Sequence, residues 1–285
     1  MNVLVPHLET VLKTEITSFD RLSGGDINSA FRLRTTSQDY FLKTNDSVSA
    51  LAMFKAESAG LAELRKADCI KIPRVTASGS VSGVAYLLME FIPSKSGTSS
   101  QMSEFGNQLA ELHTCTRPSF GLTHDNFIGS LPQSNAQMES WPDFYVERRL
   151  EPQFQMAFER GLMSVSEIPS SSEMLNAISS ICQDSKPSLL HGDLWSGNFL
   201  ISEKGIPYLI DPAVYYGDCM VDIAMSKLFG GFSQAFYDAY FEKSVPIKNK
   251  SQKIDLYQLY YLLVHLNLFG TSYHPSVITI IKRLF

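Results

Sequence analysis

The feature that most constrains the fold is a short stretch in which two apolar runs, residues 199–201 and 208–210, flank a polar turn at 202–205. Both runs are rich in residues that favour strands, and the turn contains Ser and Gly, so the stretch predicts an antiparallel hairpin. The residue before the first strand of a hairpin lies beside the residue after the second. Asn198 and Asp211 hold these positions, so we expect an amide and a carboxylate to converge.

Residues 191–198 read HGDLWSGN and bring a second carboxylate, Asp193, close to this point. Two oxygen donors at one place suit a hard cation such as Mg²⁺, which takes one or two protein ligands and completes its shell with phosphate and water. Phosphoryl transfer needs a carboxylate that accepts the proton of the attacking hydroxyl, and an amide and a carboxylate that hold magnesium. Asp193, Asn198 and Asp211 fit these roles in that order. A purely structural turn role is an equal alternative for Asn198.

His191 opens the same motif, and a transition-metal site is the other use of a histidine beside an aspartate. No second His or Cys lies nearby at ligand spacing. We therefore interpret His191 as a residue that organises the loop.

Composition limits the classes of partner. The 285-residue chain carries a net charge of -5, which argues against a nucleic-acid partner because phosphate backbones demand clustered Lys and Arg. The longest apolar run, residues 260–269, is too short to span a bilayer and is interrupted by His265 and Asn267. No secretory signal is visible at the start, and the four cysteines form no CxxC pair. We expect a cytoplasmic protein without a membrane partner.

The order of the patterns predicts an α+β fold with two lobes. Strand-like runs occur at 31–35, 40–43 and 85–90, with helical periodicity at 51–66. A Ser- and Gly-rich stretch at 94–100 suits a connection between lobes. Helical signals dominate thereafter, around 105–112, 173–182, 220–243 and 253–268. We predict a small lobe at 1–92 with an antiparallel sheet and one helix, and a larger, mainly helical lobe at 93–285.

Lys43 ends the second of these strands, and Glu57 lies on the apolar stripe of the predicted helix with Phe54 and Leu61. A carboxylate on a core-facing stripe is costly unless it is paired. We expect an ion pair in which Glu57 holds Lys43 toward nucleotide phosphates. The alternative places Glu57 at the edge of the stripe, in water.

Two further segments are candidates for contacts with the nucleotide. Gly24, Gly25 and Asn28 precede the first strand-like run, where glycines let backbone N–H groups approach phosphates. The segment is neither a GxGxxG loop nor a Walker A sequence, and a glycine pair between strands is also common for structural reasons. Glu90, Phe91 and Ile92 lie at the expected junction of the lobes, where main-chain groups can meet an adenine ring.

With these motifs the chain resembles the fructosamine kinase family, or ketosamine 3-kinases, which share the fold of aminoglycoside phosphotransferases. Trp195 is the distinguishing residue, since aminoglycoside kinases usually have His after His-Gly-Asp-Leu. The resemblance extends over nearly the whole chain. It covers the segment 24–28, Lys43, residues 89–90, 109–113, 120–121, 126–129, 141–144, 148–150 and 191–198, the Asp211-Pro212 pair, and residues 229–232.

The resemblance implies a bilobal, protein-kinase-like fold and ATP-dependent phosphorylation of the O3 hydroxyl of a ketosamine, either a free glycated amine or a glycated protein lysine. The 3-phosphate then decomposes and frees the amine. It implies Asp193 as the base, Asn198 and Asp211 as Mg²⁺ ligands, Lys43 on the phosphates of ATP, and a monomer or weak dimer. Asp211-Pro212 stands where protein kinases have Asp-Phe-Gly, so activation-loop switching is not implied.

Trp195 is our candidate for contact with the sugar, because an indole packs against a sugar or a lysyl stem while its N–H donates. His265 and Asn267 are candidates for the same pocket, with a hydrogen-bonded core role equally open for both. Asp222 is interpreted as a buried organiser of the catalytic loop. Two other functions stay open, an aminoglycoside or other small-alcohol phosphotransferase and a non-catalytic nucleotide-binding protein.

Overall fold

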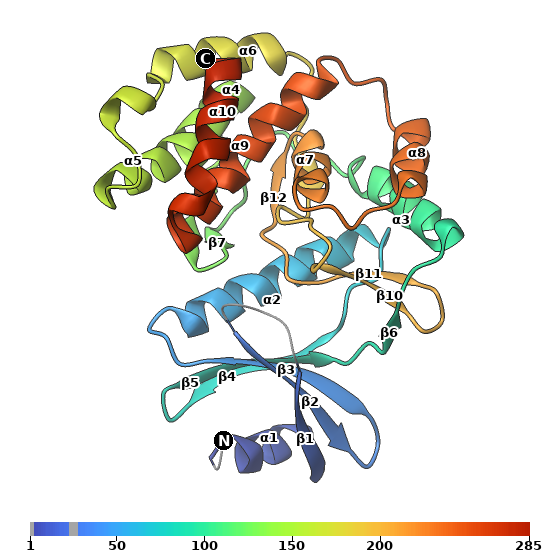
Figure 1. The fold of residues 1–285 in the computed structure, drawn as a ribbon. Coiled ribbons are helices and arrows are strands. Elements are labelled where there is room, and N and C mark those ends of the chain that lie inside the picture. Colours follow the sequence, from blue (N-terminus) through green and yellow to red (C-terminus); the bar gives the residue numbers. More distant parts are fainter. Residues whose placement is uncertain (1–2, 23–27) are drawn as a thin grey trace.

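The computed structural model describes residues 3–22 and 28–285 (Figure 1). Its N-terminal part is built on a five-stranded antiparallel sheet in the order β1-β2-β3-β5-β4. The strands are β1 Ile16–Leu22, β2 Ser29–Thr35, β3 Asp39–Asn45, β4 Val75–Val81 and β5 Val84–Glu90. The three strand-like runs of the sequence are β2, β3 and β5, so the predicted antiparallel sheet is confirmed.

Helices cover both faces of this sheet. α2 (Ala50–Ala67) packs Phe54, Leu61 and Leu64 against one face, and α1 (Leu4–Leu12) packs Leu4 and Leu8 against the other. The expectation of a single helix here is therefore wrong. The central strands β3 and β5 are mostly buried, which holds β3 and its cleft-facing side chains in place.

The remainder of the chain is mainly helical, as predicted. Its helices are α3 Ser99–Leu112, α4 Trp141–Tyr145, α5 Glu151–Glu159, α6 Ser171–Ile181, α7 Met220–Leu228, α8 Gln234–Lys243, α9 Lys250–Phe269 and α10 His274–Leu284, with a π-helix at Val146–Leu150 and 3-10 turns at Val165–Glu167 and Thr271–Tyr273. The segment 220–243 forms two helices rather than one stretch. Gly230 and Gly231 separate them with positive φ angles of 73° and 90°, a conformation that ends a helix.

The predicted hairpin is present as β10 (Phe199–Ser202) and β11 (Pro207–Leu209), with Phe199 opposite Leu209. β6 (Ser94–Lys95) pairs with the other edge of β10, so the connection expected at 94–100 is partly a strand. Four further short strands complete the larger part: β7 Asn126–Ile128, β8 Leu131–Gln133, β9 Ser188–Leu190 and β12 Tyr215–Gly217. A boundary after residue 92 stays our proposal.

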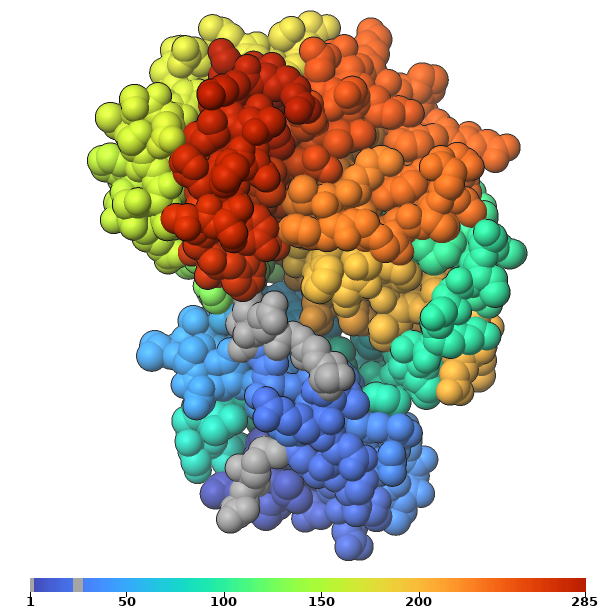
Figure 2. Space-filling model, in the orientation of Figure 1, coloured from blue at the N-terminus to red at the C-terminus, as the bar shows by residue number. Residues whose placement is uncertain are grey.

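In the space-filling view the molecule narrows between the blue N-terminal part and the yellow-to-red C-terminal part (Figure 2). Between these parts lies a cleft of about 1270 Å³. Within the described residues, no helix combines the length and the apolar character needed to cross a membrane.

Candidate active site

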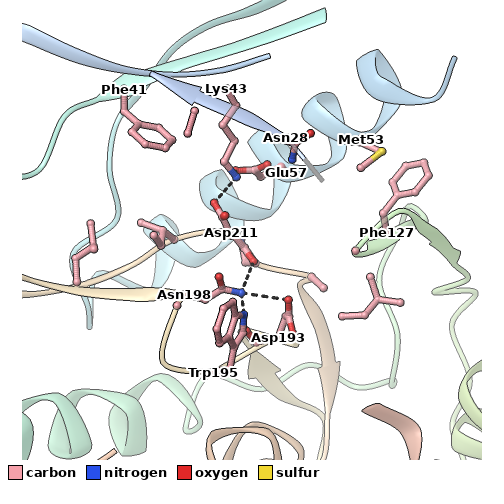
Figure 3. Close-up of a pocket in the computed structure, with 18 of the residues that line it drawn as sticks. Asn28, Phe41, Lys43, Met53, Glu57, Phe127, Asp193, Trp195, Asn198 and Asp211 are labelled. Carbon is pink, nitrogen blue, oxygen red and sulfur yellow. Dashed lines mark hydrogen bonds and ion pairs between the residues drawn. The ribbon is translucent and has the colours of Figure 1, made fainter. Parts of the chain in front are cut away.

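The open end of the β10–β11 hairpin forms the floor of the cleft (Figure 3). Ile210 N–H donates to the Asn198 carbonyl over 3.0 Å, which closes the end of the hairpin. The Asn198 side-chain amide donates to the Asp193 carboxylate over 3.1 Å and to the Asp211 carbonyl over 3.3 Å. The sequence prediction that these residues converge is confirmed.

Asp211 follows β11 with a positive φ of 54°, which is uncommon for a residue other than glycine. This turn carries its carboxylate toward Lys43 of β3, with which it forms an ion pair. The Asn198 nitrogen is engaged with Asp193, so its Oδ1 is the atom suited to a cation. An amide oxygen and a carboxylate are hard donors in the number that Mg²⁺ takes from a protein, and the two residues therefore fit that ion.

Lys43 is buried between two carboxylates. Its Nζ lies 2.8 Å from Glu57 Oε1 and also contacts Asp211, so the predicted pair with Glu57 is present. Burial lowers the pKa of an ammonium, but the charges of Asp211 and Glu57 outweigh it and raise the pKa of Lys43 above its ordinary value. Lys43 therefore stays charged, and Glu57 of α2 holds it opposite the floor of the cleft (Figure 3).

The Asp193 carboxylate accepts a hydrogen bond from the Asn198 side-chain amide. Burial, helped by the charge of Asp211, raises the pKa of the Asp193 carboxyl to about 7. A carboxylate with a pKa near neutrality accepts protons better than an ordinary one. Asp193 thus combines position and basicity for deprotonating a hydroxyl.

Buried groups fix the loop that carries Asp193. The Asp222 carboxylate accepts hydrogen bonds from the backbone N–H groups of His191 and Gly192, both over 2.8 Å. His191 Nε2 donates to the Ile210 carbonyl over 2.8 Å, while its Nδ1 accepts from Asp193 N–H over 3.2 Å. Burial lowers the pKa of His191, consistent with this neutral form. The predicted loop-organising contacts of His191 and Asp222 are therefore present.

Gly192 brings this loop against the segment that follows β11. Its φ is 82°, and a Cβ atom at this position would lie 2.1 Å from the Ala213 carbonyl oxygen. Ala213 N–H in turn donates to the His191 carbonyl over 2.9 Å. From the other side the Tyr261 hydroxyl of α9 donates to the Gly192 carbonyl over 2.6 Å. The sequence did not indicate that Tyr261 supports this loop, because its neighbours along α9 are similar large apolar residues.

Glu90, Phe91 and Ile92, which we expected from the sequence to meet a nucleotide, line the cleft, and so does Asn28. Gly24 and Gly25 lie outside the described residues. Sequence reasoning missed Arg32, whose guanidinium lies 4.5 Å from the Phe91 ring centroid. Arg32 lies on β2, next to β3. The alternation of side chains along this strand is the one sequence signal that indicated which face of the sheet Arg32 occupies.

At the opposite end, Trp195 is 39 % exposed and lines the cleft together with His265. Asn267 does not line it. Its amide donates to the backbone and side-chain oxygens of Gln153, both over 2.9 Å, in the core, so the pocket assignment of Asn267 is wrong. Sequence reasoning missed three aromatic residues of this end, Phe229, Phe269 and Tyr273.

Comparison with known proteins agrees with this geometry. The family model described as fructosamine kinase matches residues 4–285. The chain is 42 % identical to a "Probable ketoamine kinase" of Lactiplantibacillus plantarum over 95 % of both chains. It is 36 % identical to the chloroplastic protein-ribulosamine 3-kinase of Arabidopsis thaliana, over 94 % of this chain and 82 % of the relative.

Solved structures give the same assignment. A candidate fructosamine-3-kinase from Haemophilus somnus superposes with a TM-score of 0.88 at 28 % identity, over 100 % of this chain and 97 % of that one. Aminoglycoside phosphotransferase APH(4)-Ia shares the fold, with a TM-score of 0.62 at 17 % identity over 98 % of both chains. With a family model that spans the chain and relatives of this similarity, the protein belongs to the fructosamine kinase family.

Proposed function

We propose that this protein is an ATP-dependent ketosamine 3-kinase, which transfers the γ-phosphoryl group of ATP to the sugar O3 hydroxyl of a glycated amine. The observation that carries the proposal is the alignment of four groups along one cleft. Lys43, Asp211, Asn198 and Asp193 follow one another through direct contacts. The names of the relatives, ketoamine kinase and protein-ribulosamine 3-kinase, support the choice of acceptor.

In this mechanism each residue has one task. Lys43, held by Glu57, binds the phosphates of ATP, and the residues from Glu90 to Ile92 border the adenine. Asn198 and Asp211 hold Mg²⁺, which neutralises charge on the phosphates when bound. Asp193 orients the acceptor hydroxyl and accepts its proton, while Trp195 packs against the sugar. The 3-phosphate of the product then decomposes and frees the amine, so the reaction repairs glycated amines in the cytoplasm.

The test is ADP release with Mg·ATP over ribulosyl-lysine, fructosyl-lysine, an aminoglycoside and no acceptor. We expect turnover with a ketosamine, and Asp193→Asn should lower kcat by about 10²–10⁴-fold, since it keeps the shape of the side chain but removes the base. Asp238→Asn is the matched control because Asp238 is exposed on α8, and it should turn over like the wild type.

Two results would contradict the proposal. Turnover of the aminoglycoside alone would assign the protein to the other acceptor class. Undiminished turnover by Asp193→Asn would show that Asp193 is not the base.

A further inference from the structure

The acceptor end of the cleft carries a cluster of rings that the phosphoryl-transfer machinery does not use. Phe229, His265, Phe269 and Tyr273, here called the aromatic shelf, all line the cleft. The His265 ring centroid lies 4.7 Å from that of Phe229, 5.4 Å from that of Phe269 and 5.2 Å from that of Tyr273. His265 is thus the centre of one continuous ring surface.

The shelf is built by the end of α9 and the chain that follows. His265 and Phe269 are four residues apart, so they lie one above the other on one helix face. Gly270 ends α9 with a φ of 93°, and the reversal returns Tyr273 to the same face. Phe229 joins from the C-terminal end of α7. The end of α9 and its following turn are therefore joined by one residue that is distant in the sequence, Phe229, to form one wall.

The shelf starts close to the base. Tyr261 of α9 donates to the carbonyl of Gly192, the residue before Asp193. His265 lies one helical turn after Tyr261, and Phe269 lies two turns after it, at about 5.4 Å a turn. An acceptor whose hydroxyl meets Asp193 can therefore lay the groups beyond its sugar along the rings.

Two rings of the shelf stay exposed, Phe229 at 42 % and Phe269 at 47 %. Large apolar side chains exposed together inside a cleft are a sign of a binding surface. They offer area that an apolar group can cover, and their faces attract a single ammonium group.

The shelf carries no formal charge. Among the described residues, the cleft lining contributed by α7, α9 and the 3-10 turn after α9 contains no Asp, Glu, Lys or Arg. Burial lowers the pKa of His265, whose Nδ1 donates to the Tyr261 carbonyl over 2.8 Å, so its ring is neutral at pH 7. The shelf therefore offers no carboxylates to pair with a polycationic ligand and no cation to pair with a carboxylate of a ligand.

We propose that the aromatic shelf is the subsite for the amine part of the acceptor, and that it takes an uncharged hydrocarbon stem attached to a single secondary ammonium group. This inference rests on the proposed ketosamine kinase function. It predicts that amines with an alkyl stem, such as the side chain of lysine, are preferred over amines that carry a carboxylate beside the nitrogen.

The experiment compares three ketosamines of one sugar, N-pentyl, N-methyl and N-carboxymethyl, by kcat/KM. In the wild type we expect the N-pentyl compound to exceed the N-methyl compound by about tenfold, because its extra methylenes cover the rings. Phe269→Ala should reduce this ratio toward one. Phe158→Ala is the matched control, since Phe158 is also 47 % exposed but lies on α5 outside the cleft, and it should keep the wild-type ratio.

A second variant does not depend on loss of function. Phe269→Lys places a cation on the shelf and should raise kcat/KM for the N-carboxymethyl compound relative to the N-pentyl compound. An unchanged N-pentyl to N-methyl ratio in Phe269→Ala would overturn the assignment of the shelf, while turnover of all three compounds would leave the kinase function standing.

If no ketosamine is turned over, the proposed function is overturned. Calorimetry then tests separately whether the aromatic shelf binds the amine part. N-pentyl and N-methyl ketosamines are titrated into the wild type and Phe269→Ala. An affinity gain from the pentyl stem that disappears in the variant supports the shelf, and equal affinities for the two compounds reject it.

Discussion

Single side chains in the cleft depend closely on their partners. Lys43 contacts both Glu57 and Asp211, and these carboxylates have different exposures. The Glu57 side chain is 13 % exposed, whereas that of Asp211 is 38 % exposed and faces the cleft. Glu57 is therefore the permanent partner of Lys43, whereas Asp211 can leave Lys43 and bind a cation.

This difference predicts the effect of Glu57→Gln. Without its permanent partner, Lys43 pairs with Asp211 alone and is drawn from the phosphates, so we expect KM for Mg·ATP to rise by about tenfold, the effect of one lost charge-assisted bond. Initial rates at varied Mg·ATP measure it. Glu104→Gln, at an exposed position of α3, serves as the control. An unchanged KM would mean that Glu57 does not position Lys43.

The comparison of Glu57 with Asn267 shows what a sequence can predict at this scale. Both are polar residues on apolar helical runs, yet only the prediction for Glu57 found its partner. A buried charge demands an opposite charge, and Lys43 was the cation at hand. An amide is satisfied by any backbone carbonyl or amide, so nothing in the sequence distinguished a cleft position from the core contact of Asn267 with Gln153.

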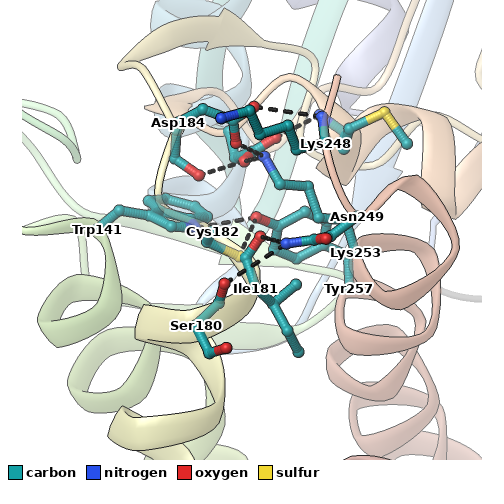
Figure 4. A network of polar contacts seen from close by, with 12 residues as sticks. Trp141, Ser180, Ile181, Cys182, Asp184, Lys248, Asn249, Lys253 and Tyr257 are labelled. Carbon is teal, nitrogen blue, oxygen red and sulfur yellow. Dashed lines mark hydrogen bonds and ion pairs between the residues drawn. The ribbon is translucent and has the colours of Figure 1, made fainter. Parts of the chain in front are cut away.

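Polar contacts also decide how neighbouring elements join, as around the N-terminal half of α9 (Figure 4). Lys253 Nζ lies 2.8 Å from Asp184 and 2.8 Å from Asp218. Asn249 donates to the Ile181 carbonyl at the end of α6 over 3.1 Å. The side chains of Lys253 and Asp218 are only 3 % and 2 % exposed, so α9 is fixed to the α6 end and to the segment before α7 by buried charges.

Lys253→Met should therefore lower the free energy of unfolding by about 3–5 kcal/mol, because it leaves Asp218 buried without a cation. Urea denaturation measures this loss. Lys243→Met tests an exposed pair with Glu111, at 3.5 Å, and should change stability by less than about 1 kcal/mol. Adding Asp218→Asn to Lys253→Met should recover part of the lost free energy of unfolding. Equal losses in Lys253→Met and Lys243→Met would contradict the role of burial.

Two strands of the N-terminal sheet were not predicted from the sequence, and both lie at its edges. β1 and β4 are the edges of the five-stranded sheet, where one side of a strand meets solvent and the apolar alternation is weak. The 220–243 stretch looked like one helix because its apolar periodicity continues across Gly230 and Gly231. In contrast, the β10–β11 hairpin was predictable because a turn and two strand-like runs indicated the same structure.

At the scale of the whole molecule, α2 connects the two parts. Its Glu63 accepts from Arg117 over 2.7 Å and from the Tyr216 hydroxyl over 3.0 Å, both in the C-terminal part. The Lys71 carbonyl also accepts from Leu209 N–H of β11 over 3.1 Å. The helix that holds Lys43 in place is thus anchored to the part that carries Asp193, which aligns the two halves of the cleft.

This anchor makes stability depend on pH. Burial opposes the charge of Glu63, but hydrogen bonds from Lys66 and Tyr216 and the charge of Arg117 lower its pKa in the folded state. The anchor therefore stabilises the fold above the ordinary glutamate pKa of about 4.3, and this stabilisation is lost as pH falls through the lowered folded-state pKa.

We expect Glu63→Gln to cost about 1–3 kcal/mol at pH 7, the value of bonds to a charged group, and less at pH 3.5. Urea denaturation of the wild type and the variant at both values measures the difference. Glu203→Gln, on the exposed turn of the β10–β11 hairpin, is the control for stability. A cost that is the same at both pH values would mean that the carboxylate charge does not contribute to the anchor.

The tight approach of Gly192 to Ala213 has a consequence for how distant sequences are interpreted. A methyl group at position 192 would collide with the Ala213 carbonyl oxygen. This glycine is therefore required by the close contact between the loop of Asp193 and the segment after β11, rather than by contact with nucleotide or sugar. A homologous gene with any larger residue there would encode a displaced Asp193 even if every acidic residue were retained. The glycine thus offers a criterion for recognising decayed, inactive copies of the enzyme that counting catalytic residues would overlook.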